Sequence, residues 1–227
     1  MTSMDVADAR DAVHGACLRM VADGLVIGSA GNISVRVDEH RFVVTAAGVP
    51  YDRLTAADHP VVDGRTGGWD GPRRPTSEIA LHVEVLGAMP DVGAVVHTHS
   101  RYAAAFAVAR LDLPFICNES MATHAERVLV TAYAPPGSTD LGAQALATFR
   151  RQPGSRAVLL ANHGVVAIGP TLADAELVAR SVEWTAEICH LARTLVAAGT
   201  GEHVLDRAVQ DAIARNYGVT IAGTDPP

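Results

Sequence analysis

Two histidines close an apolar stretch of the chain. His97 and His99 stand one residue apart at the end of VGAVVHTH, residues 92–99, which the apolar pattern predicts to be a strand. Residues i and i+2 of a strand point to the same face, so both imidazoles could reach one metal ion. Taken alone, this spacing is more typical of packed or surface histidines than of metal ligands.

A third histidine occurs in a similar setting. His163 ends the apolar run AVLLANH and precedes Gly164, which permits a tight backbone turn. Three imidazoles with an open fourth position are typical of a catalytic Zn²⁺ or a similar divalent ion. The alternative is that His163 is a turn residue held by local hydrogen bonds.

Glu78 is the candidate for acid–base chemistry. It falls in the first turn of a helix predicted at 76–89, with Thr76 or Ser77 as the cap. A carboxylate there could serve as a general base or as a displaceable metal ligand. Acidic residues also favour helix N-termini through the helix dipole alone. His82, four residues further on, shares the face of Glu78, and a structural histidine is its preferred interpretation.

The stretch GSAGNISV, residues 28–35, could approach an anion. Small residues followed by Asn32 leave backbone N–H groups free to bind a phosphate. The stretch is neither a Walker loop nor a dinucleotide fingerprint. Without further information it is simply a turn before a strand.

Composition limits the class of protein. Of 227 residues, 48% are hydrophobic and 19% charged, as in ordinary globular domains. The net charge of -7, with no basic block, argues against nucleic acid or anionic membranes as partners. The sequence has no apolar stretch long enough to predict a membrane span, and its first residues show no secretory signal. Three widely spaced cysteines favour the reducing cytoplasm.

Helices and strands alternate along the predicted chain. Helices are expected at 4–23, 76–89, 101–109, 139–151, 171–198 and 204–216. Strands are expected at 32–37, 41–46, 92–99 and 127–132, and in two pieces of 156–169, with a Gly- and Pro-rich loop at 61–75. No repeat and no long linker occurs, so we predict one α/β layered domain over residues 1–227.

Five short motifs in this order resemble the class II aldolase and adducin family. They are GNIS, TAAGVPYDRL, PTSEIALH, VVHTHS and ANHGVVAIG, and the resemblance covers about residues 8–220. It implies a central mixed, largely antiparallel sheet flanked by helices. It also implies a homotetramer with active sites between neighbouring subunits, and a mobile C-terminal tail from about residue 217.

The resemblance also implies roles for individual residues. Glu78 is similar to the family's acid–base carboxylate, and Tyr217 to a tyrosine proton donor near the C-terminus. The implied metal ligands are His97, His99 and His163, and the implied phosphate-binding residues are Asn32, Gly48, Thr76 and Ser77. Zn²⁺ is the expected ion, with Mn²⁺ or Fe²⁺ as alternatives because imidazole suits all three.

The implied reaction is cleavage of a ketose 1-phosphate. The products are dihydroxyacetone phosphate and a short aldehyde, and the developing charge is an enediolate stabilised by the metal. A decarboxylase of a 3-oxo sugar-acid phosphate, a sugar-phosphate 4-epimerase and an Fe(II) oxygenase remain alternatives on the same fold. A non-catalytic interaction module is disfavoured because the three histidines and Glu78 are all present.

The sequence departs from the family pattern at two places. Ala47 stands where a threonine is common, so one hydroxyl donor to phosphate is missing. Asn118 stands near the position of an active-site tyrosine that handles the aldehyde. Glu119 or His124 could take over part of that role.

Overall fold

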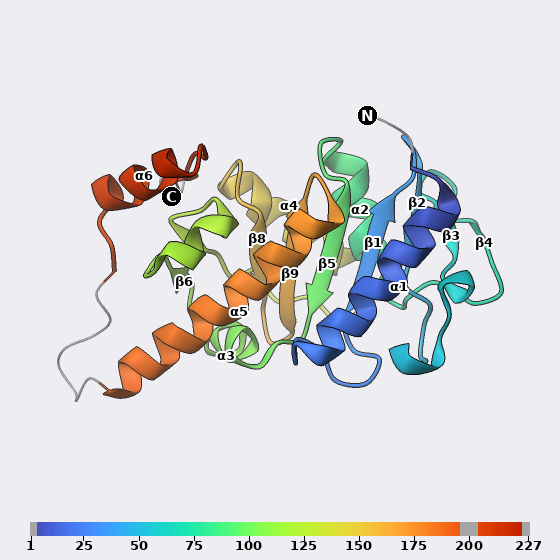
Figure 1. Ribbon diagram of the computed structural model, residues 1–227, viewed down its shortest axis with the longest axis horizontal. Coiled ribbons are helices and arrows are strands. Elements are labelled where there is room, and N and C mark those ends of the chain that lie inside the picture. The colour runs from blue at the N-terminus through green and yellow to red at the C-terminus, as the bar shows by residue number, and fades with distance from the viewer. Residues whose placement is uncertain (1–3, 196–203, 224–227) are drawn as a thin grey trace.

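A seven-stranded sheet forms the centre of the computed structural model, which describes residues 4–195 and 204–223 (Figure 1). The strand order is β4-β3-β2-β1-β5-β9-β8, and every neighbouring pair is antiparallel. Parallel pairing is confined to isolated bridges. The expected mixed, largely antiparallel sheet is therefore confirmed. Its strands are β1 (Asn32–Arg36), β2 (Arg41–Val44), β3 (Val61–Asp63), β4 (Trp69–Asp70), β5 (Ala94–Thr98), β8 (Ala157–Leu160) and β9 (Gly164–Gly169).

Helices cover both faces of this sheet (Figure 1). One apolar core joins α1, α3 and α5 to one face, and a second core joins α2 and α4 to the other. The described helices are α1 (Val6–Ala22), α2 (Ile79–Ala88), α3 (Arg101–Ala109), α4 (Thr139–Arg151), α5 (Leu172–Leu195) and α6 (Arg207–Asn216). Three short 3₁₀ helices are η1 (Tyr51–Arg53), η2 (Ala56–Asp58) and η3 (Asn118–Thr123), and β6 (Leu113–Pro114) pairs with β7 (Arg127–Val128). No described helix is long and apolar enough to cross a membrane.

The alternation of side chains along β5 decides where its histidine goes. Ala94 and Val96 belong to the core beneath α1, α3 and α5, whereas Val95 belongs to the core beneath α2 and α4. His97 therefore lies on the face that α2 covers. All five residues of β5 are buried, because the strand lies inside the sheet with helices on both sides.

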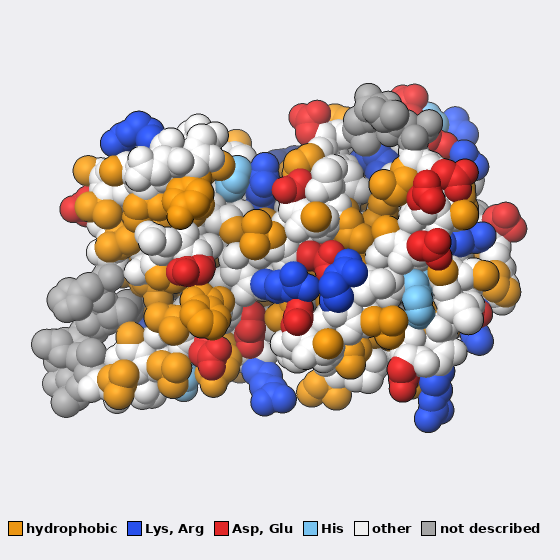
Figure 2. All heavy atoms as spheres, in the orientation of Figure 1, with side chains coloured by type: hydrophobic (Ala, Val, Ile, Leu, Met, Phe, Trp, Pro, Cys, Tyr) orange, Lys and Arg blue, Asp and Glu red, His pale blue; other side chains and the backbone are white. Residues whose placement is uncertain are grey.

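Ion pairs join the two long helices on the α1–α5 face. Arg19 donates two hydrogen bonds, of 2.9 and 2.8 Å, to the carboxylate of Glu176, and Arg180 donates one of 2.6 Å to Asp23. Figure 2 shows basic and acidic side chains gathered where α1 and α5 lie next to each other. The forked Arg19–Glu176 pair fixes the distance between the helices more strictly than a single contact would.

Several predicted boundaries shift in the structure. The helix predicted at 76–89 begins at Ile79, so Glu78 is its N-cap residue, and the expectation of Thr76 or Ser77 as cap is wrong. The reason is that Thr76 stays tied to β2 through its N–H, which donates to Thr45 O at 2.9 Å. The loop predicted at 61–75 contains β3 and β4, which pair at the sheet edge. The predicted end of the helix at 171–198 lies outside the described residues.

The segment after α6 lies against the body of the protein. Ile221 is buried, and Ala222 donates to His124 O at 2.7 Å and accepts from Glu126 N at 3.1 Å. A mobile tail beginning near residue 217 stays a prediction, and residues 224–227 lie outside the described part of the chain.

A buried histidine anchors the end of β2. His59 is fully buried, its Nδ1 accepts a hydrogen bond from Ala46 N at 3.3 Å, and its carbonyl accepts one from Arg10 Nε at 2.9 Å. Burial, with help from the charges of His14 and Arg10, lowers the pKa of His59 from 6.5 to about 4. The folded protein therefore holds His59 neutral at pH values where the unfolded chain would protonate it.

We predict that His59 makes the protein sensitive to mild acid. Its contribution to stability is complete above pH 6.5 and is lost as the pH falls to about 4, by up to about 3 kcal/mol. Denaturant unfolding between pH 7 and 4 measures this loss. His59→Gln should flatten the pH dependence, whereas His40→Gln, at a half-exposed position, should not. An unchanged slope in His59→Gln would contradict the prediction.

Candidate metal centre and active site

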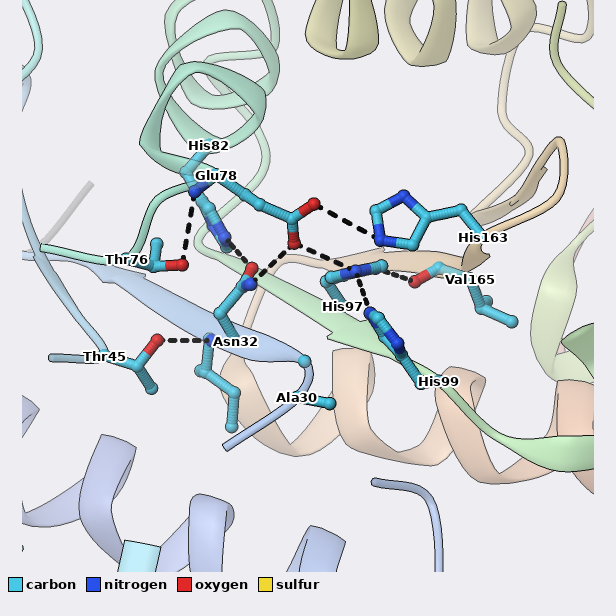
Figure 3. Close-up of polar contacts among 12 residues, drawn as sticks. Ala30, Asn32, Thr45, Thr76, Glu78, His82, His97, His99, His163 and Val165 are labelled. Carbon is cyan, nitrogen blue, oxygen red and sulfur yellow. Dashed lines mark hydrogen bonds and ion pairs between the residues drawn. The ribbon is translucent and has the colours of Figure 1, made fainter. Parts of the chain in front are cut away.

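Four side chains from three segments of the chain converge at the end of β5 (Figure 3). His97 lies on β5, His99 directly follows it, His163 lies in the turn between β8 and β9, and Glu78 precedes α2. One ligand atom from each of the four lies within 4.8 Å of the others. The structure thus brings together the three predicted histidines and the predicted carboxylate.

The contacts within this cluster are short. His97 Nε2 lies 3.0 Å from His99 Nε2 and 3.1 Å from Glu78 Oε2. His163 Nε2 lies 3.3 Å from Glu78 Oε1. The three imidazole rings have equal centroid separations of 4.8 Å and meet edge to face. The nitrogens are therefore presented around one small volume rather than stacked.

Two glycines allow the backbone to come this close. A Cβ at Gly31 would lie 2.6 Å from His97 O, and a Cβ at Gly164 would lie 2.1 Å from Thr98 O. Gly31 also has a positive φ of 75°. Any larger residue at either position would push β1 or the β8–β9 turn away from the end of β5.

The donor set fits a cation. His97 Nδ1 must donate to Val165 O, at 2.8 Å, because a carbonyl can only accept. In the neutral form of this ring, a lone pair on Nε2 would face both Glu78 Oε2 and His99 Nε2. Such lone pairs repel unless a proton or metal ion lies between them. Glu78 Oε1 is also buried without a hydrogen-bond partner among the described residues, as a carboxylate oxygen reserved for a cation would be.

The protonation states also suit metal binding. Burial, and then the charge of His97, lowers the pKa of His99 to about 4 and lowers the pKa of His163. Burial alone raises the pKa of Glu78, but bonding to His97 and Asn32 and the charge of His163 together hold it below its usual value. His99 and His163 are therefore neutral and Glu78 is ionised near pH 7, as ligation requires.

A chain of buried hydrogen bonds supports Glu78 from behind (Figure 3). Asn32 Nδ2 donates to Glu78 Oε2 at 2.8 Å, and Asn32 Oδ1 accepts from His82 Nε2 at 2.5 Å. His82 Nδ1 in turn accepts from the Ser34 hydroxyl at 2.6 Å. His82 is fully buried and burial lowers its pKa to about 3. It therefore orients Asn32, and it touches the metal cluster only through that residue.

A cleft of about 500 Å³ opens onto the cluster. Its lining contains Glu78, His99 and His163 together with the predicted phosphate-binding residues Asn32, Gly48, Thr76 and Ser77. Ser29, Thr45, Pro136 and Asn162 also line it, and the sequence interpretation did not select them as site residues. The sequence could have indicated Asn162, because it stands directly before His163 in the predicted break between two strands. In the structure it adopts a left-handed φ of 56°, which asparagine tolerates better than most residues.

Other predicted site residues lie elsewhere. Tyr217 follows α6, with 61% of its surface exposed, and α6 lies far from β5 beyond the β8 end of the sheet (Figure 1). Asn118 and Glu119 begin η3 and are exposed, and His124 follows η3. None of these four lines the cleft of the described chain.

Comparison with known proteins places this geometry in context. The family model described as Class II Aldolase and Adducin N-terminal domain matches residues 11–190. The 5-methylthioribulose-1-phosphate/5-deoxyribulose-1-phosphate aldolase of Rhodospirillum rubrum is 37% identical over 72% of each chain. The 3-oxo-tetronate 4-phosphate decarboxylase of Haemophilus influenzae is 34% identical over 73% of this chain and 79% of its own. A solved structure of L-fuculose 1-phosphate aldolase superposes with a TM-score of 0.83 and 28% identity, covering 93% of this chain and 96% of that one.

We predict that the cluster binds one divalent ion per chain. The metal-free protein, titrated with Zn²⁺ against a chromophoric chelator, should show one tight site. His99→Ala or His163→Ala should weaken that site at least about 100-fold, because each removes one of only four donors. His14→Ala is the matched control, because His14 lies on α1 outside the cluster. Equal affinity in all three variants would contradict the assignment.

Proposed function

Because the chain belongs to the class II aldolase and adducin family, we propose that it is a metal-dependent aldolase that cleaves a ketose 1-phosphate. The products are dihydroxyacetone phosphate and a short aldehyde. One observation carries the proposal: a single cleft is lined by Glu78 and two of the clustered histidines, and also by small and hydroxyl-bearing residues. The R. rubrum relative is itself named an aldolase of ketose 1-phosphates.

His97, His99 and His163 would hold the ion, with Glu78 as a further, displaceable donor. Zn²⁺ suits this donor set best, and Mn²⁺ and Fe²⁺ are alternatives. When bound, a divalent ion there supplies Lewis-acid polarisation of the substrate carbonyl. The fixed tautomer of His97, set by Val165 O, keeps its Nε2 available to the ion.

Glu78 would move the proton at the carbon next to the carbonyl. During cleavage, the bond between C3 and C4 breaks and its electron pair stays with the dihydroxyacetone phosphate fragment. The C4 hydroxyl loses its proton as the aldehyde forms, and Glu78, in its acid form, gives a proton to C3 of the dihydroxyacetone phosphate fragment. In the reverse direction the Glu78 carboxylate removes that proton again. Displacement of the carboxylate from His97 and His163 would leave burial as the main influence on Glu78, and burial raises its pKa. The carboxylate would then become basic enough for this role.

The small and hydroxyl-bearing residues of the cleft would bind the phosphate. Gly48, with a positive φ of 71°, lines the cleft, where its backbone N–H would be a donor, and Thr76 and Ser77 add hydroxyl groups. Asn32 also lines the cleft, so it would contact the phosphate while its amide holds the Glu78 carboxylate. The net charge of -7 is no obstacle, because backbone donors act locally.

The proton acceptor or donor at the aldehyde oxygen would come from another subunit. Tyr217 is exposed and lies far from the cluster of its own chain, which agrees with a homotetramer whose active sites lie between neighbours. We place the reaction in the cytoplasm, because none of Cys17, Cys117 and Cys189 forms a disulfide in the described chain.

A decarboxylase is the second candidate. The H. influenzae relative named as a 3-oxo-tetronate 4-phosphate decarboxylase is nearly as similar as the R. rubrum aldolase. Both reactions leave an electron pair next to a carbonyl, so the same donors and the same phosphate-binding residues would serve either one. Only the group that leaves differs.

We predict metal-dependent release of dihydroxyacetone phosphate from a panel of ketose 1-phosphates. The panel contains the 1-phosphates of L-fuculose, 5-deoxyribulose and 5-methylthioribulose, and dihydroxyacetone phosphate is measured with a coupled dehydrogenase. Glu78→Gln should lower kcat about 100-fold or more with little change in KM, because proton transfer is lost while binding remains. Glu84→Gln, at an exposed position on the same helix, should behave as wild type.

The outcomes separate the two candidates. Protein that holds stoichiometric metal but releases no dihydroxyacetone phosphate from any ketose would refute the aldolase. Release of CO₂ from 3-oxo-tetronate 4-phosphate by the same preparation would establish the decarboxylase. Full activity in Glu78→Gln would refute the role of Glu78 in either reaction.

We predict that Ala47 weakens phosphate binding. Ala47 lines the cleft beside Gly48, where relatives of this type commonly have a threonine. Ala47→Thr should lower KM about 10-fold for a phosphorylated substrate, as one hydrogen bond to a charged group adds roughly 1.5 kcal/mol. Ala47→Val has the same shape without the hydroxyl and should give no gain. Equal effects of the two variants would show that the phosphate lies elsewhere.

A further inference from the structure

Helix α3 connects two of the three clustered histidines. It begins at Arg101, two residues after His99, and its last turn reaches the residue before His163. His99 lies outside β5, so the strand ladder does not fix it directly. The N–H of His99 donates a hydrogen bond to Leu25 O, at 3.1 Å. Its position therefore depends in part on where α3 starts, two residues further along the chain.

An acidic residue from α5 holds that start. The carboxylate of Glu183 accepts hydrogen bonds from the backbone N–H groups of Tyr102, at 3.0 Å, and Ala103, at 2.9 Å. These are the N2 and N3 amides, which an N-cap side chain usually satisfies. The N-cap residue Ser100 makes no such bond, and its hydroxyl lies 3.4 Å from that of Thr98 instead. Glu183, about 80 residues further along the chain on α5, thus takes the place of an N-cap side chain for α3.

The other end of α3 is tied to the turn that carries His163. Asn162 N donates to Ala107 O at 3.3 Å, and the Arg110 guanidinium donates to Asn162 Oδ1. Both Asn162 and Arg110 adopt left-handed backbone conformations, with φ of 56° and 57°. The last turn of α3 and the turn before His163 therefore move together.

We infer that Glu183 is a positioning residue for the metal centre. Its carboxylate fixes the N-terminal end of α3, and α3 as a rigid helix sets the distance between the His99 and His163 imidazoles. The negative charge also lies at the positive end of the helix dipole, which strengthens the attachment. This inference rests on the proposed function, because it takes the four-residue cluster to be the metal site. Glu183 itself touches neither the cluster nor the cleft.

Metal-binding measurements on the full-length protein test this role. Glu183→Ala removes both acceptors, Glu183→Gln keeps one acceptor oxygen, and Glu187→Gln is the control one turn further along α5. Zn²⁺ affinity is measured by chelator competition. The visible absorption of bound Co²⁺ reports the arrangement of the ligands. Thermal unfolding of each metal-free protein reports the fold.

The inference predicts graded losses. Glu183→Ala should raise the apparent Kd for Zn²⁺ about 10- to 100-fold, the usual effect of removing a residue that orients metal ligands. It should also alter the Co²⁺ spectrum. Glu183→Gln should show a smaller change and Glu187→Gln none. If Glu183→Ala does not fold, the comparison of Glu183→Gln with Glu187→Gln decides.

Two results would overturn the inference in distinguishable ways. Folded Glu183 variants with the Zn²⁺ affinity and Co²⁺ spectrum of wild type would show that Glu183 only stabilises the fold, and the proposed function would be untouched. Wild-type protein that binds neither ion would refute the metal centre itself, and with it the proposed function.

Discussion

The candidate active site depends on how closely three chain segments can approach the end of β5. Gly31, directly before β1, lies against the carbonyl of His97, and Gly164, at the start of β9, lies against that of Thr98, at distances that leave no room for a side chain. Glycine is therefore required at positions 31 and 164 for reasons of space. Once these segments are in contact, Asn32 and His163 come within reach of Glu78 without further adjustment. The chemistry of the site thus follows from backbone packing.

Electrostatics then divides the site into two parts. In one part, His99 and His163 are neutral because burial disfavours their charge, and Glu78 is ionised because its neighbours stabilise the charge. Three imidazoles bound as neutral ligands and one carboxylate would contribute a net charge of -1, so a divalent ion would make the centre positive. In the other part, the cleft is lined by the hydroxyl-bearing residues Thr76 and Ser77 and by Gly48, whose backbone N–H would be a donor. A chain with an overall charge of -7 can therefore present a positive site to an anionic sugar phosphate.

The sequence predicted the parts of this site that depend on short-range pattern. The strand period placed His97 on one face, and the cluster with His99, His163 and Glu78 lies where three predicted elements end. The start of α2 was off by one to three residues, because the tie between Thr76 and β2 is a tertiary contact that local capping preference does not reveal. Glu183 could not be predicted at all. An acidic residue in the middle of a long helix has no local signature for a bond made across 80 residues.

The position of β5 in the sheet also governs the order in which the protein can be built. Its neighbours are β1, about 60 residues earlier, and β9, about 70 residues later. Neither pairing is a local hairpin, so both require large loops to close before the ladder gains any hydrogen bonds. A chain emerging from the ribosome cannot complete the central pairings until β9 has been synthesised. The three imidazoles therefore meet late in folding, and a metal ion would encounter a finished set of donors only in an almost complete domain.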